Sequence, residues 1–175
     1  DDSVGTYLPI FTRNQKGHVT IRQLFAHISG FPDEELVESR NQTLEQVVGN
    51  IARTVPLAYR PSSAFLYGGT SMQIGRRIAE LAGGKPWNEL FQERIAGPCG
   101  LTGSSFRLIT VNNSRIAGGM ASTPEDIIRF AELIRRRGVG LNGQRILSEK
   151  AVDEFWKDQT NRARIIYSLY PVRPP

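Results

Sequence analysis

An amphipathic helix that begins shortly after Tyr67 constrains the fold of this chain more than any other sequence feature. Apolar residues recur three and four positions apart over Met72–Ala82, the spacing that places them on one face of a helix. Gly83-Gly84 ends this pattern, and the hydroxyl of Thr70 or Ser71 can accept a hydrogen bond from a free amide of the first turn. The pattern therefore predicts a helix whose positively polarised N-terminus lies beside the Tyr67 phenol.

Helix signals recur along the rest of the chain, whereas strand signals are few. Thr43 with Gln46 has the spacing of a capping box. Further helices are predicted after Thr20, from Pro86, over 124–137 and after Ser148. Extended structure is predicted over 104–111, with a short strand over 145–147, while residues 1–17 are predicted to be extended or irregular. The expected fold class is therefore mostly α, with few short strands.

The length and composition are those of one globular domain. A chain of 175 residues buries roughly 70% of the surface that its unfolded form exposes. Its content of 39% hydrophobic and 22% charged residues is typical of soluble globular proteins, and no apolar run approaches the roughly 18 residues of a membrane span. We expect a single domain over 1–175, with a helical region at 1–160, an irregular tail at 161–175 and no membrane span.

The net charge of +5 raises the question of an anionic partner. Arg135-Arg136-Arg137 lies at the end of a predicted helix, where cations complement the helix dipole and are usually solvated. No basic groove interleaved with aromatic residues accompanies it. We therefore expect no nucleic-acid partner, and a basic nucleic-acid-associated domain remains the less favoured alternative.

The histidines and the single cysteine do not have the spacing of a metal site. His18, His27 and Cys99 are too scattered for a zinc pattern, so no metal is expected. An imidazole titrates near neutral pH, so His27 could act as a general base. Its place at a predicted helix end beside Ser29-Gly30 favours a structural or C-capping role instead.

Five segments in the same order resemble one family. Val19–Gly30 resembles the segment ITIRxLLxHTSG, and Pro61–Arg77 resembles PGxxFxYSNxGYxxLGxI. The remaining matches are Gly84–Leu101 to GKPYxExxxxxIxxPLGM, Gly118–Asp126 to GGGLxSTxxD, and Gly143–Ser148 to the usual sequel. Together they resemble the serine β-lactamase and penicillin-binding-protein-like family, of the class C β-lactamase, DD-peptidase and esterase type. The resemblance covers about 1–156 and implies the helical subdomain of that α/β fold.

The resemblance implies an acyl-serine mechanism without a metal or cofactor. The family's nucleophile is the serine of a Ser-x-x-Lys helix, and a Tyr-x-Asn motif supplies a tyrosine that helps to move protons. Tyr67 matches that tyrosine and is the candidate catalytic residue. Gly69 matches the asparagine, a substrate-binding position, and lacks the side-chain amide. This departure weakens a β-lactamase assignment more than an esterase or acyl-transfer assignment.

The other motifs of the family are missing from the chain. The sequence contains no Ser-x-x-Lys, Lys-Thr-Gly or His-x-Gly. We therefore expect a fragment truncated at both ends, inactive by itself, from a hydrolase that acts on an amide, ester or lactam in a small-molecule or peptidoglycan-like substrate. The alternative is a non-catalytic helical binding or interaction module on the same scaffold. A fragment would expose an apolar face and could self-associate. The sequence assigns no compartment, although the resemblance implies a periplasmic or secreted parent protein.

Overall fold

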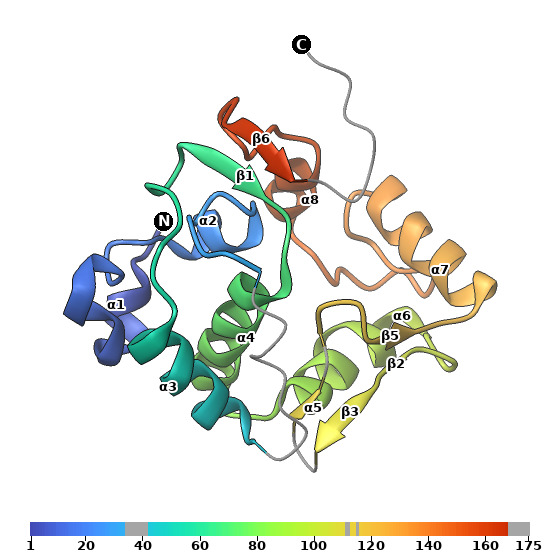
Figure 1. Ribbon diagram of the computed structural model, residues 1–175. Coiled ribbons are helices and arrows are strands. Elements are labelled where there is room, and N and C mark those ends of the chain that lie inside the picture. The colour runs from blue at the N-terminus through green and yellow to red at the C-terminus, as the bar shows by residue number, and fades with distance from the viewer. Residues whose placement is uncertain (34–41, 111–112, 115, 168–175) are drawn as a thin grey trace.

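The computed structural model describes residues 1–33, 42–110, 113, 114 and 116–167. Helices dominate this part of the chain, and the strands are short (Figure 1). The amino-terminal helices are α1 (Val4–Tyr7), a 3-10 helix (Pro9–Gln15), α2 (Ile21–Phe25), α3 (Leu44–Thr54) and α4 (Gly69–Gly83). The later helices are α5 (Trp87–Phe91), a π-helical turn (Gln92–Ala96), α6 (Gly97–Cys99), α7 (Pro124–Arg135) and α8 (Glu149–Phe155).

The capping signals in the sequence locate most helix starts correctly. Thr20 and Thr43 each form a complete capping box with the glutamine three residues later. Thr123 and Ser148 accept hydrogen bonds from backbone amides of α7 and α8. Gly84 ends α4 in the left-handed conformation with φ +67°, because a residue without Cβ adopts it at little cost. Local chemistry therefore fixes these helix ends.

Two predictions for the amino-terminal half were wrong. Residues 1–17 are largely helical, because Val4 and Phe11 are buried against the core and hold helices too short to show a periodic pattern. The helix after Tyr67 begins at Gly69, with Gly68 as its N-cap, rather than at Thr70 or Ser71. Thr70 and Ser71 are buried within the first turn.

The strands form three two-stranded pairs within the described residues. β1 (Ala64–Leu66) pairs in parallel with β6 (Arg164–Tyr167), as the green and red arrows of Figure 1 show. β2 (Ser105–Phe106) and β5 (Met120–Ala121) are antiparallel, as are β3 (Leu108–Thr110) and β4 (Asn113–Ser114). The extended structure predicted over 104–111 is confirmed up to residue 110, and Val111 lies outside the described residues. At 145–147 the predicted strand is reduced to an isolated bridge between Val139 and Arg145.

The prediction of an irregular tail over 161–175 was wrong for 164–167. That segment forms β6, whose register aligns Ala64 with Arg164. Its partner lies 100 positions earlier in the sequence, so no local pattern could show the pairing. Residues 168–175 lie outside the described part of the chain.

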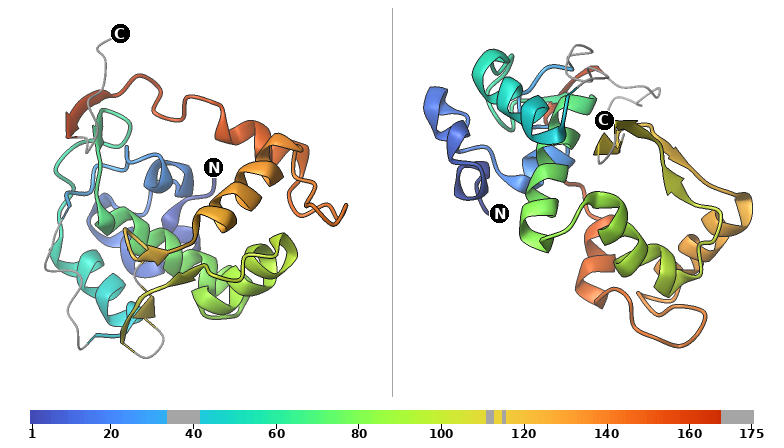
Figure 2. Two further views of the ribbon diagram at one scale, coloured as in Figure 1. Left: turned by 90° about the vertical axis from the view of Figure 1, so that its right-hand side faces the viewer. Right: turned by 90° about the horizontal axis from the view of Figure 1, so that it is seen from below.

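The apolar core has two parts. The larger one lies among α1, α2, α3 and α4, and the smaller one lies between α6 and α7. Figure 2 (right) shows α4 in green between the blue and cyan amino-terminal helices and the yellow and orange segments that follow. Contacts of α4 with α1, α2, α3 and α5 agree with this central position. Tyr67 lies at the start of this central helix, immediately after β1.

Candidate active site

The backbone around Tyr67 is held by the segment that follows α2. The carbonyl of His27 accepts a hydrogen bond from the amide of Leu66 at 2.9 Å, and that of Ile28 accepts one from Ser62 at 2.7 Å. The carbonyl of Gly30 accepts one from Ala58 at 2.8 Å. These bonds fix the course of the loop that leads through β1 to Tyr67.

Two side-chain hydrogen bonds add to this framework. The hydroxyls of Ser29 and Ser71 share a buried hydrogen bond of 2.7 Å, which joins the segment after α2 to the first turn of α4. Gln23 donates from Nε2 to the hydroxyl of Ser62 at 2.8 Å, while its Oε1 completes the capping box of α2. The half-buried Tyr67 therefore follows a loop that is bonded to α2 and to the segment after it, and that segment is in turn bonded to α4.

His27 is the aromatic neighbour of Tyr67. The centroids of the two rings are 4.6 Å apart and the rings are tilted by 37°, and a second, edge-on contact joins His27 to Phe65 at 5.8 Å. The residue has φ +57° and follows the end of α2, where a structural or C-capping role was predicted. The contact with Tyr67 was not predicted, because the two residues are 40 positions apart.

The environment of His27 disfavours its charged form. Burial lowers the pKa of the imidazole, and the nearby Asp33 carboxylate opposes this shift. The Nδ1 atom is buried and has no hydrogen-bond partner. A neutral imidazole at neutral pH follows from this surrounding, and a protonated Nδ1 would place an unsatisfied donor in the interior.

Asp33 closes the N-terminus of α4. Its Oδ1 accepts a hydrogen bond of 2.7 Å from the amide of Gly69, a favourable place for a carboxylate at the positive end of a helix. A Cβ at Gly68 would lie 2.6 Å from Cβ of Asp33, so this close approach requires glycine. Sequence reasoning missed Asp33 because its contact spans 36 positions. The backbone amide of Gly69, the predicted substrate-binding position, is thus engaged within the protein.

A buried ion pair supports the far part of α4. Arg76 is fully buried and pairs with Glu80 at 2.9 Å, and burial lowers the pKa of its guanidinium. Glu80 also accepts a hydrogen bond of 3.0 Å from the amide of Trp87 at the start of α5. The pair therefore joins α4 to the next helix, and its removal would leave an uncompensated buried charge.

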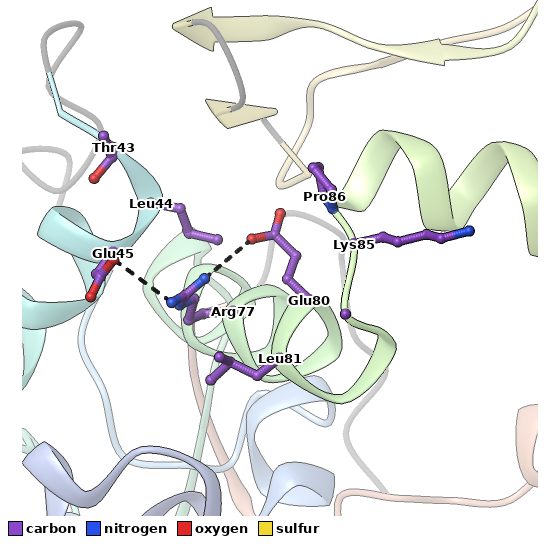
Figure 3. A pocket seen from close by; sticks show the side chains of 9 residues that line it. Thr43, Leu44, Glu45, Arg77, Glu80, Leu81, Lys85 and Pro86 are labelled. Atoms are coloured by element: carbon purple, nitrogen blue, oxygen red, sulfur yellow. Dashed lines mark ion pairs between the residues drawn. The ribbon is translucent and has the colours of Figure 1, made fainter.

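A separate hollow of about 480 Å³ lies at the far end of α4, as Figure 3 shows. Arg77 extends into it and pairs with Glu45 at 3.8 Å and with Glu80 at 3.9 Å. A more apolar hollow of about 730 Å³ lies between α2 and α8. Tyr67 lines neither of them. The two hollows are therefore distinct from the candidate active site.

A metal site and a membrane span each have requirements that the described residues would have to meet. No group of three or more His, Cys, Asp or Glu side chains there could hold a metal ion. Within the same residues, no helix is long and apolar enough to cross a membrane. Cys99 is a buried free thiol, and burial raises the pKa of this thiol.

Known proteins have a similar fold. A protein described as a "putative beta-lactamase" from Bacteroides dorei DSM 17855 is 34% identical, with a TM-score of 0.84 over 97% of this chain and 52% of its own. The β-lactamase/D-alanine carboxypeptidase from Pseudomonas syringae is 21% identical, with a TM-score of 0.66 over 86% of this chain and 47% of its own.

A sequence relative agrees with the structural ones. A "Putative D-alanyl-D-alanine carboxypeptidase" of Escherichia coli (strain K12) is 28% identical over 123 residues, which cover 61% of this chain and 27% of that protein. The chain thus spans about half, or less, of the length of these relatives. The family model described as Beta-lactamase matches residues 1–164. With the fold, the five sequence segments and this match in agreement, the chain belongs to the β-lactamase family.

Proposed function

We propose that this chain forms the helical, Tyr67-bearing part of a β-lactamase-related serine hydrolase that works through an acyl-serine intermediate. The observation that carries the proposal is that the backbone around Tyr67 is held in a fixed position. Its loop is hydrogen-bonded to the segment after α2, and it stands immediately before the N-terminus of α4. A proton-transferring phenol needs such a fixed position, because general acid–base catalysis depends first on geometry.

The proposed chemistry requires a nucleophile from outside these 175 residues. A serine oxygen attacks the carbonyl carbon of the substrate, and its proton passes by way of a lysine and Tyr67 to the leaving amine or alcohol. The bond between the carbonyl carbon and the leaving group breaks, and water then hydrolyses the acyl-serine ester. Since the sequence contains no Ser-x-x-Lys, we infer that the isolated chain does not turn over substrate.

Gly69 narrows the substrate class within this proposal. The residue offers no side-chain amide, and its backbone amide already donates to Asp33. A substrate amide therefore has no side-chain partner at this position. This favours ester hydrolysis or acyl transfer over hydrolysis of a β-lactam, whose amide would otherwise be bound here.

Two experiments test the proposal. The isolated chain is incubated with a chromogenic cephalosporin, a short-chain nitrophenyl ester and a fluorophosphonate probe, and neither turnover nor covalent labelling is expected. Labelling of the isolated chain would contradict the assignment of the nucleophile to another segment.

The second experiment uses a longer protein that carries this chain behind a Ser-x-x-Lys segment. Tyr67→Phe should lower kcat by about 10²- to 10⁴-fold, which is the range of a general acid–base group. Tyr59→Phe, at an exposed tyrosine, is the matched control and should leave kcat unchanged. Equal activity of the two variants would refute a catalytic role for Tyr67.

A non-catalytic binding module on the same scaffold is the second candidate. The observation in its favour is that the sequence contains no Ser-x-x-Lys, Lys-Thr-Gly or His-x-Gly. Reading the codons on both sides of this segment separates the two candidates. A Ser-x-x-Lys upstream and one of the other two motifs downstream support the enzyme, whereas a start codon directly before Asp1 supports the module.

We also propose that the isolated chain self-associates through apolar side chains on α7 and at the end of α8. Ile127 and Ile128 of α7 are exposed, as are Phe155 and Trp156, and Trp156 retains 76% of its accessible surface. α7 and the end of α8 thus each expose two large apolar side chains that are adjacent in sequence, and exposed apolar patches mark interaction sites. Sedimentation should show dimers or larger species, and a clean monomer without dye-binding apolar surface would exclude this.

A further inference from the structure

We propose that His27 is the positioning residue of Tyr67, and that it holds the phenol in place only while its imidazole is neutral. The inference rests on the proposed function, in which Tyr67 transfers protons. It assigns His27 no contact with substrate. Its role is to fix the ring of the residue that makes that contact.

The contact between the two rings is the first support. A centroid separation of 4.6 Å with a tilt of 37° lies at the close end of the range for interacting aromatic rings. Phe65 contacts the same imidazole edge-on. The imidazole of His27 therefore contacts two aromatic rings, those of Phe65 in β1 and of Tyr67 just after it. A rotation of the Tyr67 ring would disrupt its contact with the imidazole.

The backbone of His27 supplies an independent attachment to the same place. Its carbonyl accepts the hydrogen bond from Leu66, the residue directly before Tyr67. Its φ of +57° lies in the small left-handed region, which few residues other than glycine adopt. One residue thus fixes both the backbone that leads into Tyr67 and the ring of Tyr67.

The charge dependence follows from the surroundings of the imidazole. Within the part of the chain that the structure describes, the titratable groups beside it are Asp33, from the segment after α2, and the Tyr67 phenol, from the segment after β1. Nδ1 is shielded from water and has no partner, so protonation would bury an unsatisfied donor. The attraction of Asp33 opposes this only in part, because burial is the larger effect on the pKa of His27. Acid should therefore displace the ring and release Tyr67.

The test follows the tyrosine Cζ resonances of the 175-residue chain with ¹³C-labelled tyrosine. The chain has five tyrosines and two histidines, so Tyr67→Phe and His18→Asn suffice to assign the relevant signals. Between pH 8 and pH 4, the Tyr67 resonance should move in one step. The midpoint of that step should coincide with the titration of His27 and lie below the ordinary histidine value of about 6.5. The other four tyrosines should not share this step.

Two variants separate the ring contact from the titration. His27→Phe keeps an aromatic ring, so the Tyr67 resonance should stay near its original position at pH 7 and lose the acid step. His27→Asn suits the left-handed backbone but removes the ring, so Tyr67 should lose at least about half of its displacement from the free-tyrosine position. His18→Asn, at an exposed histidine, is the matched control and should change neither.

The titration of the unmodified chain decides the proposal even if a variant fails to fold. A Tyr67 resonance that does not respond while His27 titrates would overturn it, as would a His27 midpoint at or above the ordinary histidine value of about 6.5. In the longer protein described above, His27→Asn should lower kcat at least about tenfold with little change in KM, and His27→Phe should restore most of the loss. Absence of hydrolase activity would refute the proposed function and leave the NMR result intact, so the two failures are distinguishable.

Discussion

The two regions that flank the end of α4 are built on different principles. Among the described residues of 1–83, fourteen buried apolar side chains form one core, and the loop before Tyr67 is bonded to α2 and to the segment after it. Among those described in 87–155, the core cluster holds four buried apolar side chains. Tyr67 therefore lies on the region with the larger core, which suits the proton-transfer role that we propose for it.

The second region depends more on polar contacts. Asp126, at the start of α7, accepts a hydrogen bond of 2.8 Å from the amide of Gly103 and one of 2.7 Å from the hydroxyl of Ser104. Ser104 in turn shares a hydrogen bond of 2.7 Å with Ser122. The stability of a region with a small core and a buried carboxylate network should depend more strongly on pH than that of a region with a large apolar core.

The largest expected effect is the loss of a large side chain from the first core. Ile51→Ala should reduce the free energy of unfolding by about 4 kcal/mol, because Ile51 is fully buried in a core that cannot collapse around the cavity. Leu133→Ala should reduce the free energy of unfolding by about 2 kcal/mol. The loss is smaller because Leu133 has few buried neighbours, and the partly exposed side chains packed against them can move into the cavity. Urea unfolding of both variants measures the difference. Equal losses would mean that the two regions are equally well packed.

The next effect is expected at two glycines, one in each region, that have the same backbone conformation. Gly30 and Gly138 both have φ +87°, and an added Cβ would lie 2.1 Å from the carbonyl oxygen of Tyr59 in one case and of Leu147 in the other. Either change to alanine should cost about 3 kcal/mol, the sum of backbone strain and weakened hydrogen bonds. Gly30→Ala alone should shift the Tyr67 resonance. An equal shift in Gly138→Ala would contradict the separation of the regions.

A smaller effect is expected on acidification. The hydrogen bond from Ser104 holds the pKa of Asp126 below its ordinary value. Lys157, Arg22 and Gln159 lower that of Glu154 to about 2. Because both folded values lie below the unfolded ones, these carboxylates stabilise the fold fully above about pH 4.5. Their contribution is lost as the pH falls toward 2.

Amide exchange between pH 4 and pH 2 measures this loss. Protection should fall first in α7 and α8. The buried cationic groups of the first region, Lys16 and Arg76, stay protonated over this range, so they add no acid step. Asp126→Asn and Glu154→Gln should each make the amide protection of α7 and α8 depend less on pH. Simultaneous loss of protection in α3 and α7 would show that the regions unfold together.

The smallest effect on stability is expected at the exposed face of α7. Ile128→Gln should change the free energy of unfolding by less than about 0.5 kcal/mol, because Ile128 is 63% exposed. It should nevertheless weaken self-association in sedimentation experiments. Ile10→Gln, at an exposed residue of the first region, is the matched control and should leave association unchanged. Loss of association in the control alone would place the contact on the first region.

Much of the helical framework could be predicted from residues close together in the sequence. The helix start after Thr20, the capping box of Thr43 and the stop at Gly83-Gly84 were correct. The errors arose where the deciding partner was distant. The start of α4 moved to Gly69 because Asp33 occupies its N-terminus, and β6 formed because β1 offered a partner. The helices of residues 1–17 escaped prediction because burial of Phe11, rather than periodicity, holds them.

The sequence by itself determined the family and the helical character, and it marked Tyr67 as the candidate residue, because these depend on residue types in a fixed local order. Only the tertiary structure decided what surrounds Tyr67. The ring of His27 meets that of Tyr67, the carboxylate of Asp33 meets the amide of Gly69, and the hydroxyl of Ser71 meets that of Ser29, in each case from segments that are not adjacent in the chain. Local spacing cannot encode such meetings, since they arise only when the large core brings α2 against α4.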